Sequence, residues 1–66
     1  MRKWTVAITE HDVVDFFEFP NYESAYNYAL TSAFLMFNKY FTCEEITEIF
    51  DRQNGFRLGP NVVSLF

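Results

Sequence analysis

Apolar and polar residues alternate along residues 3–9, where Trp4, Val6 and Ile8 fall on one face. A period of two predicts a strand with one buried face. Residues 13–19, VVDFFEF, are rich in β-branched and aromatic side chains and predict a second strand. Because only the polar break EHD separates the two runs, they are predicted to pair as a β-hairpin.

The second predicted strand carries phenylalanine on both of its faces. One face holds Val13, Asp15, Phe17 and Phe19, and the other holds Val14, Phe16 and Glu18. Only one of these faces should cover the core, so we expect apolar surface to remain exposed on the other.

A helical pattern begins after Pro20, which ends the strand because it lacks an N–H donor. Asn21 is the predicted N-cap, and Glu23 lies in the first turn, where the helix dipole favours a carboxylate. The helix is predicted to run from Tyr22 to Tyr40. Its continuous apolar face consists of Tyr22, Tyr26, Ala29, Ala33, Phe37 and Tyr40. The opposite side is also partly apolar, with Tyr28, Phe34, Leu35 and Met36.

Thr42 opens a second predicted helix with a strong local signal. Thr42 and Glu45 match a capping box, in which each side chain bonds the backbone N–H of the other residue. Phe41 and Ile46 have the spacing of a hydrophobic staple across the same turn. The helix is predicted to end near Gln53, with Gly55 in the left-handed position that follows a helix C-terminus.

The C-terminal residues predict one further strand. Residues 62–66, VVSLF, follow a Gly-Pro-Asn turn, and residues 56–58 are left open as an additional pairing segment. The predicted order is ββααβ in an α+β fold, with a three-stranded antiparallel sheet and two helices packed on one face. We expect residues 1–66 to form a single compact domain.

Composition restricts what else the chain can be. The 66 residues include one cysteine, Cys43, and one histidine, His11, so an intrachain disulfide and a His/Cys metal cage are both excluded. The net charge of −4 argues against direct binding to nucleic acid and against binding to an anionic membrane surface. No targeting segment or membrane-length apolar run is present, and we expect a complete small gene product in the bacterial cytoplasm.

No catalytic motif stands out. The chain lacks G-x-S-x-G, P-loop and G-x-G-x-x-G patterns. Cys43 is predicted at the first position of the second helix, but Glu44 and Glu45 beside it oppose thiolate formation. His11 lies in the predicted hairpin turn, where solvation is its expected state. We therefore predict a protein that is not an enzyme and that has no metal and no cofactor.

Two surface features remain for a function. Acidic residues group on the hairpin and the start of the first helix (Glu10, Asp12, Asp15, Glu18 and Glu23) and along the second helix (Glu44, Glu48 and Asp51). They form either a solvated face or a surface that imitates nucleic-acid phosphates and occupies a basic groove on another protein. The chain also has nine Phe, four Tyr and one Trp, more apolar surface than so small a domain should bury. We expect part of it to form a homodimer or a heteromeric contact.

In size, acidity and the order hairpin–helix–helix–strand, the whole chain resembles the small inhibitors that phages encode against host machinery. Anti-CRISPR proteins are the nearest group, and at least one of them shares the ββααβ order. Uracil-DNA glycosylase inhibitors form a second group. The resemblance implies a non-enzymatic inhibitor that binds a bacterial defence or DNA-processing protein, such as a CRISPR–Cas complex, in the host cytoplasm.

The predicted partner-binding residues form two groups, one acidic and one aromatic or aliphatic. They are Asp12, Asp15, Glu18, Glu44, Glu48, Asp51, Tyr28, Phe34 and Met36. Carboxylates would provide steering and specificity, and apolar side chains would provide affinity. The alternatives are a small homo-oligomeric structural or assembly protein and, with only His11 and Cys43 as candidates for chemistry, an enzyme.

Overall fold

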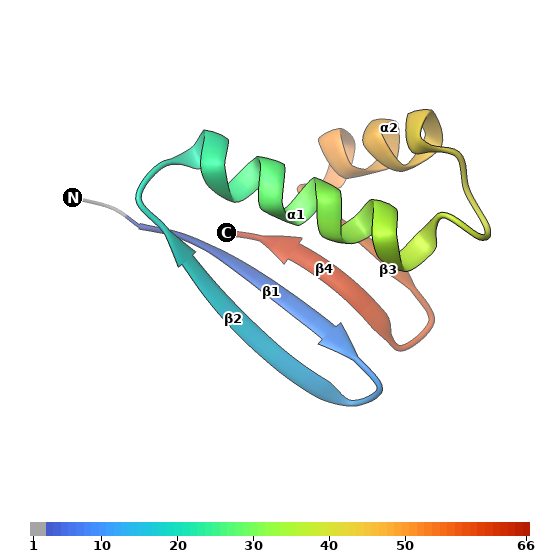
Figure 1. Ribbon diagram of the computed structural model, residues 1–66, viewed down its shortest axis with the longest axis horizontal. Helices are drawn as coiled ribbons and strands as arrows, with labels where there is room; N and C mark the ends of the chain where they lie inside the picture. Colours follow the sequence, from blue (N-terminus) through green and yellow to red (C-terminus); the bar gives the residue numbers. More distant parts are fainter. Residues whose placement is uncertain (1–2) are drawn as a thin grey trace.

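The computed structural model describes residues 3–66 and places two helices on one side of an antiparallel sheet (Figure 1). The elements are β1 (Trp4–Glu10), β2 (Val13–Phe19), α1 (Tyr22–Phe37), α2 (Cys43–Gln53), β3 (Gly55–Leu58) and β4 (Asn61–Leu65). The four strands lie in the order β2-β1-β4-β3. The α+β class is confirmed, whereas the predicted number of three strands is wrong.

The additional strand is β3, which pairs antiparallel with β4 from Gly55 opposite Ser64 to Leu58 opposite Asn61. Four residues are too few for periodicity to distinguish a strand from a loop, so only the pairing defines β3. Asn54, rather than Gly55, takes the left-handed conformation after α2, with φ 54° and ψ 36°. This residue reverses the chain so that the next residues run directly along β4.

The predicted hairpin is present. β1 and β2 pair residue for residue from Trp4 opposite Phe19 to Glu10 opposite Val13. His11 and Asp12 form the two-residue turn with φ values of 52° and 67°. Positive φ at both central residues is the mark of a type I′ turn, whose twist matches that of the flanking strands.

Helix α1 begins where the sequence predicts, since the Ser24 N–H donates to Asn21 Oδ1 at 2.8 Å. It ends at Phe37, one turn earlier than the predicted end at Tyr40. Its fully buried stripe is Ala25, Ala29, Ala33 and Phe37. Three alanines at a spacing of four allow the helix to lie close to the sheet, and this displaces Tyr22 and Tyr26 to the side of the buried face.

Helix α2 begins with the predicted capping box. Glu45 N–H donates to Thr42 Oγ1 at 3.2 Å, and Thr42 N–H donates to Glu45 Oε1 at 2.9 Å. Ile46 and Phe50 are its buried residues. The N-cap interaction alone contributes about 1 kcal/mol in comparable helices.

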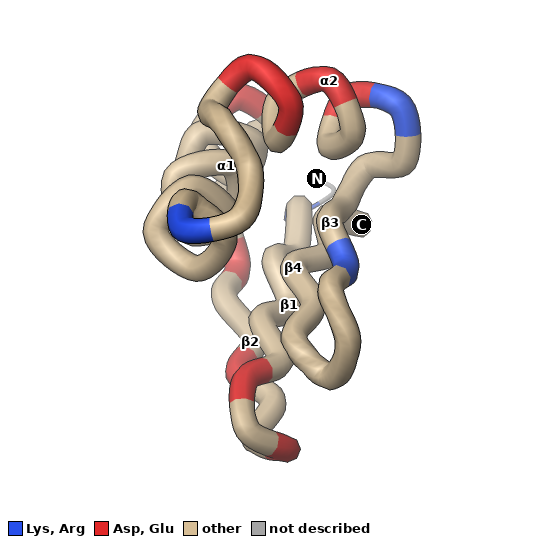
Figure 2. The backbone as a smooth tube through the Cα atoms, turned by 90° about the vertical axis from the view of Figure 1, so that its right-hand side faces the viewer, with Lys and Arg blue, Asp and Glu red and all other residues tan. Residues whose placement is uncertain are grey.

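The core lies between the helices and one face of the sheet, which we call the inner face. It consists of Val6, Ala25, Ala29, Ala33, Phe37, Ile46, Phe50, Phe56, Val63 and Leu65. Aromatic rings join its parts, since Phe56 of β3 packs at 4.5 Å from Phe37 and at 5.3 Å from Phe41, measured between ring centroids. Both helices lie on this side, so no described element covers the opposite face of the sheet (Figures 1 and 2).

Candidate protein-interaction surface

The uncovered side of the sheet, here called the outer face, carries apolar side chains among small ones. Because Val6, Val63 and Leu65 point into the core, the alternate residues of each strand must point outward. Phe16 lies opposite Ala7, which lies opposite Ser64, and Phe16 is 65% exposed. A large ring beside such small neighbours projects from the sheet.

Two further large apolar side chains extend this outer face. Val14 lies opposite Thr9 and is 48% exposed. Phe66 exchanges two backbone hydrogen bonds with Thr5, at 2.7 and 2.9 Å, so its side chain shares the outer face with that of Thr5. The prediction that β2 leaves apolar surface exposed is therefore confirmed.

The hairpin that carries Phe16 and Val14 is acidic. Residues 4–19 contain Glu10, Asp12, Asp15 and Glu18 and no Lys or Arg. All four are exposed, and none forms an ion pair or a hydrogen bond with its side chain among the residues that the structure describes. These four charges equal the net charge of −4, because the other acidic residues are matched in number by Lys and Arg.

Strand β2 is also one edge of the sheet, and one side of its backbone has no strand partner within residues 3–66. Thr5 bonds Phe66 on the β4 side of β1. Since backbone groups alternate along a strand, Val6 and Ile8 bond toward β2, where their partners are Phe17 and Asp15. The N–H and C=O groups of the alternate β2 residues therefore point away from the sheet. We call this side the open β2 edge; its outward residues are Val14, Phe16 and Glu18.

The acidic row of α2 lies elsewhere and is partly occupied by internal contacts. Figure 2 shows the backbone positions of the acidic residues of α2, in red, at one end of the molecule and those of the β1–β2 hairpin toward the other. Glu48 accepts from Arg52 at 3.0 Å, and Asp51 accepts from the Tyr26 hydroxyl at 2.5 Å. Glu44 is exposed and has no such contact with the described residues. The structure thus does not bring the two predicted acidic groups together.

The contact between Tyr26 and Asp51 has an electrostatic consequence. It raises the pKa of Tyr26 from 10.0 to about 12, first because the hydroxyl donates to the carboxylate, and then because burial and the charge of Asp51 disfavour a phenolate. A group whose pKa is higher in the folded state than in the unfolded state stabilises the fold. This contribution is fully present when the pH lies below the unfolded-state pKa. That contribution is lost as the pH rises from about 10 toward 12.

We therefore expect the urea midpoint of the protein to fall as the pH rises through this range, and to fall less steeply for Tyr26→Phe. Asp51→Asn should flatten the same part of the curve, because it removes the charge that disfavours the phenolate. The measurement is urea unfolding, followed by circular dichroism, at a series of pH values between about 8 and 12. Parallel curves for all three proteins would show that this contact does not contribute to stability.

The predicted apolar binding residues of α1 differ in exposure. Tyr28 is 39% exposed and its ring packs at 5.1 Å from Phe17 and 5.2 Å from Phe19. Phe34 and Met36 are partly buried and pack against the core. The most exposed apolar side chains near them are instead Leu35, at 74%, and Tyr40, at 70%.

Sequence reasoning placed Tyr40 on the buried stripe of the first helix because it extended that helix by one turn. Since α1 ends at Phe37, Tyr40 follows in a turn where its N–H donates to the Phe37 carbonyl at 3.0 Å. The side chain therefore leaves the stripe that the helical spacing had given it. Asn38, the C-cap residue, directly follows Phe37 and is the local signal for this end.

An open groove of about 660 Å³ lies where the end of α1 diverges from the β1–β2 turn. Leu35, Met36 and Tyr40 line one side, and Glu10 and His11 line the other. Asn61 also lines it, and its Oδ1 atom is buried without a hydrogen-bond partner among the described residues. The groove is a mixed polar and apolar surface that adjoins the acidic hairpin.

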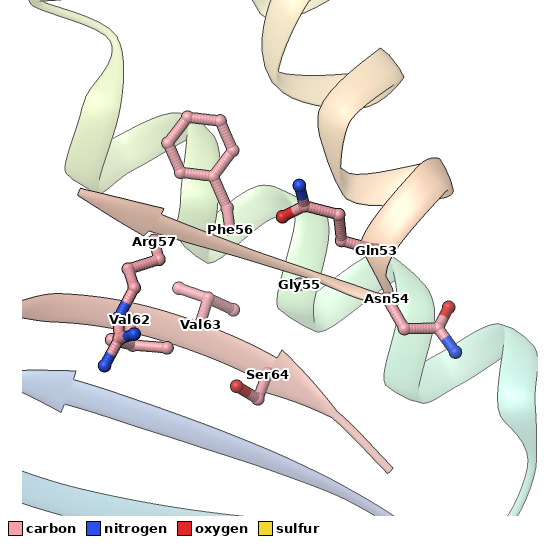
Figure 3. A pocket seen from close by; sticks show the side chains of 8 residues that line it. All are labelled: Gln53, Asn54, Gly55, Phe56, Arg57, Val62, Val63 and Ser64. Carbon is pink, nitrogen blue, oxygen red and sulfur yellow. The ribbon is translucent and has the colours of Figure 1, made fainter.

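A second hollow, of about 320 Å³, lies between the end of α2 and the β3–β4 pair (Figure 3). Phe56 and Arg57 point to opposite sides of β3, so the core ring and the exposed guanidinium flank it from different faces. Gln53, Asn54 and Ser64 supply its other polar groups. These groups include no nucleophile with a neighbouring base.

Within residues 3–66, no three His, Cys, Asp or Glu side chains lie together in a way that could hold a metal ion. Cys43 is an exposed free thiol at the start of α2, and His11 is exposed in the hairpin turn. Neither helix in the described part of the chain is long and apolar enough to cross a membrane.

Comparison of the chain with protein-family models, with curated proteins and with solved structures found no match. The functional conclusion therefore depends on the geometry of this surface.

Proposed function

We propose that this protein is a non-enzymatic inhibitor that binds a basic, nucleic-acid-binding surface of a bacterial protein. In this proposal the target is a defence or DNA-processing protein of the host cytoplasm, such as a CRISPR–Cas complex, and the inhibitor is phage-encoded. One observation carries the proposal: residues 4–19 hold four carboxylates and no Lys or Arg, on a hairpin whose exposed side chains include Phe16 and Val14.

Charge and apolar surface have different roles in such a contact. Exposed carboxylates attract a basic partner at long range and raise the association rate, while they exclude acidic and nucleic-acid partners. All nine Asp and Glu side chains of this protein are exposed. Aromatic and aliphatic side chains that lose water at the centre of the contact supply most of the affinity.

The hairpin is a better candidate than α2 for the electrostatic part of this contact. Glu48 and Asp51 already have internal partners, and those contacts would have to be exchanged on binding. Asp12, Asp15 and Glu18 have no such contacts with described residues. The outer-face ring of Phe16 lies between the last two of them along the same strand.

The test neutralises three hairpin carboxylates with Asp12→Asn, Asp15→Asn and Glu18→Gln. Asparagine tolerates the positive φ of Asp12, so the turn should persist. We expect association with the captured target to slow by about tenfold or more at about 0.1 M salt, and the difference to shrink at about 1 M salt. Association rates would be measured with the immobilised protein against its purified target.

The matched control removes the same number of charges from α2 by Glu44→Gln, Glu48→Gln and Asp51→Asn. The target itself would be obtained by affinity capture from bacterial lysate, identified by mass spectrometry, and challenged with duplex DNA. Equal effects of the two triple variants, or a target that duplex DNA does not displace, would refute the proposal as stated.

A homo-oligomeric assembly protein is the second candidate, and the uncovered outer face favours it. Phe34→Asp is an unsuitable test of this candidate, because Phe34 packs against the core and its loss would disturb the fold. Phe16→Asp and Leu35→Asp change exposed positions instead. Sedimentation that depends on concentration and is lost in either variant would favour this second function.

A further inference from the structure

We propose that the open β2 edge accepts an extended, basic segment of the target protein as an additional strand of the sheet. This inference rests on the proposed function and specifies how the target would be held. Its first support is the backbone of β2, where Val14, Phe16 and Glu18 each direct an N–H and a C=O away from the sheet. Such a row of unpaired groups is a template for another strand.

Several devices that protect a sheet edge are absent from β2, and its charged side chains are the carboxylates Asp15 and Glu18. The strand has seven residues, contains no Lys and no Pro, and pairs with β1 residue for residue without a bulge. Pro20 lies beyond its end. The opposite edge differs, since β3 has only four residues and lies against α2. A partner strand therefore has more backbone to pair with on β2 than on β3.

Charge identifies the kind of segment that would pair there. Asp15 projects from the inner face of β2 and Glu18 from its outer face, and both are exposed. A second copy of this hairpin would bring four more carboxylates and no Lys or Arg to the same edge. A segment with Lys or Arg opposite Asp15 and Glu18 would instead form opposite-charge cross-strand pairs, which stabilise a sheet.

The side chains between these two carboxylates complete the pattern. Phe16 projects outward and Phe17 lies partly buried against the core on the inner side. In an antiparallel partner, the residues opposite them should be aromatic or β-branched, because such cross-strand pairs pack well. The expected segment therefore reads basic–apolar–apolar–basic–apolar from its N-terminus, the last residue lying opposite Val14.

The first probe is the blocked peptide Thr-Lys-Val-Tyr-Lys-Val-Thr, titrated into the full-length, isotope-labelled protein. Its tyrosine lies opposite Phe16 in this pairing, so the tyrosine N–H bonds to the protein, whereas the N–H of the preceding valine points away. An N-methyl group on the tyrosine should weaken binding by about tenfold, since it removes one hydrogen bond and obstructs the edge. The same group on that valine is the matched control and should have little effect.

We expect the amide signals of Val14, Phe16 and Glu18 to shift on binding, and a peptide with Glu in place of both Lys not to bind. Absence of binding by the Lys peptide overturns the inference, as do equal affinities of the two N-methylated peptides or shifts confined to α2. Sedimentation of the protein alone tests whether a second copy of this chain occupies the edge instead. A dimer that Phe16→Pro abolishes and Phe16→Ala retains would assign the edge to a second copy.

The captured target separates this inference from the proposed function. If Phe16→Pro loses the target while Phe16→Ala retains part of the affinity, the open edge is the binding element, since only proline removes the outward N–H. If the target is captured equally by both variants and in the presence of the peptide, the inhibitor function stands and strand addition is refuted. Capture of no basic target refutes the proposed function itself.

Discussion

Phe37→Ala is expected to leave the protein largely unfolded at room temperature. Phe37 is 1% exposed at the end of α1, and its ring packs against that of Phe56 from β3. Truncating a buried Phe to Ala costs about 3–5 kcal/mol, because transfer free energy is lost and a cavity remains. A core in a chain of this size supplies roughly the same amount, about 3–5 kcal/mol, so little net stability would be left.

The loss would be measured by urea unfolding, followed by circular dichroism. Leu35→Ala is the matched control: it lies in the same helix, two residues earlier, but is 74% exposed. Its cost should be within about 0.5 kcal/mol, as for most surface substitutions. A Phe37→Ala protein with a cooperative transition close to that of Leu35→Ala would contradict the packing of α1 on β3.

Gly55→Ala is expected to have the second large effect, and whether it raises or lowers the stability of the protein is diagnostic. Gly55 begins β3, and a Cβ atom there would lie 2.7 Å from the backbone oxygen of Val63. Glycine weakens an ordinary strand position, so alanine would be mildly stabilising if there were space. Because the obstructing atom is backbone of the neighbouring strand, the β3–β4 pair must shift, and we expect a loss of about 1–3 kcal/mol.

The comparison for this variant is Arg57→Ala, two residues along β3 on the same face and exposed. It changes side-chain size without crowding β4 and should cost much less. Thermal unfolding of the parent, Gly55→Ala and Arg57→Ala proteins gives the order of their melting temperatures. A melting temperature of Gly55→Ala equal to or above that of the parent would show that β3 does not approach β4 as closely as described.

Several elements were predictable because local interactions define them. The Asn21 and Thr42 caps join groups three residues apart, and both are present. The alternation in residues 3–9 and 13–19 correctly predicted the hairpin and the separation of the two faces of β2. In each case the interacting residues lie close together in the sequence, so a short stretch of sequence is enough to predict the contact.

Errors occurred where a distant partner decides the structure. Strand β3 exists because β4 pairs with it. The end of α1 at Phe37 rather than Tyr40 is a separate, local error, because Asn38 caps the helix although the apolar spacing continues past it. Exposure within the predicted site also depends on packing. Phe34 and Met36 are half-buried against the core, while Tyr28 remains exposed.

The sequence by itself determined the α+β class, the two helix starts, the hairpin and the concentration of negative charge in residues 4–19. Periodicity assigns residues to faces within one element. It does not state which face another element covers, because that depends on packing between segments far apart in the chain. Only the tertiary structure therefore decided that the outer face and the β2 edge remain open. It also decided that Asp51 of α2 accepts a hydrogen bond from Tyr26 of α1, while the hairpin carboxylates stay unpaired among the described residues.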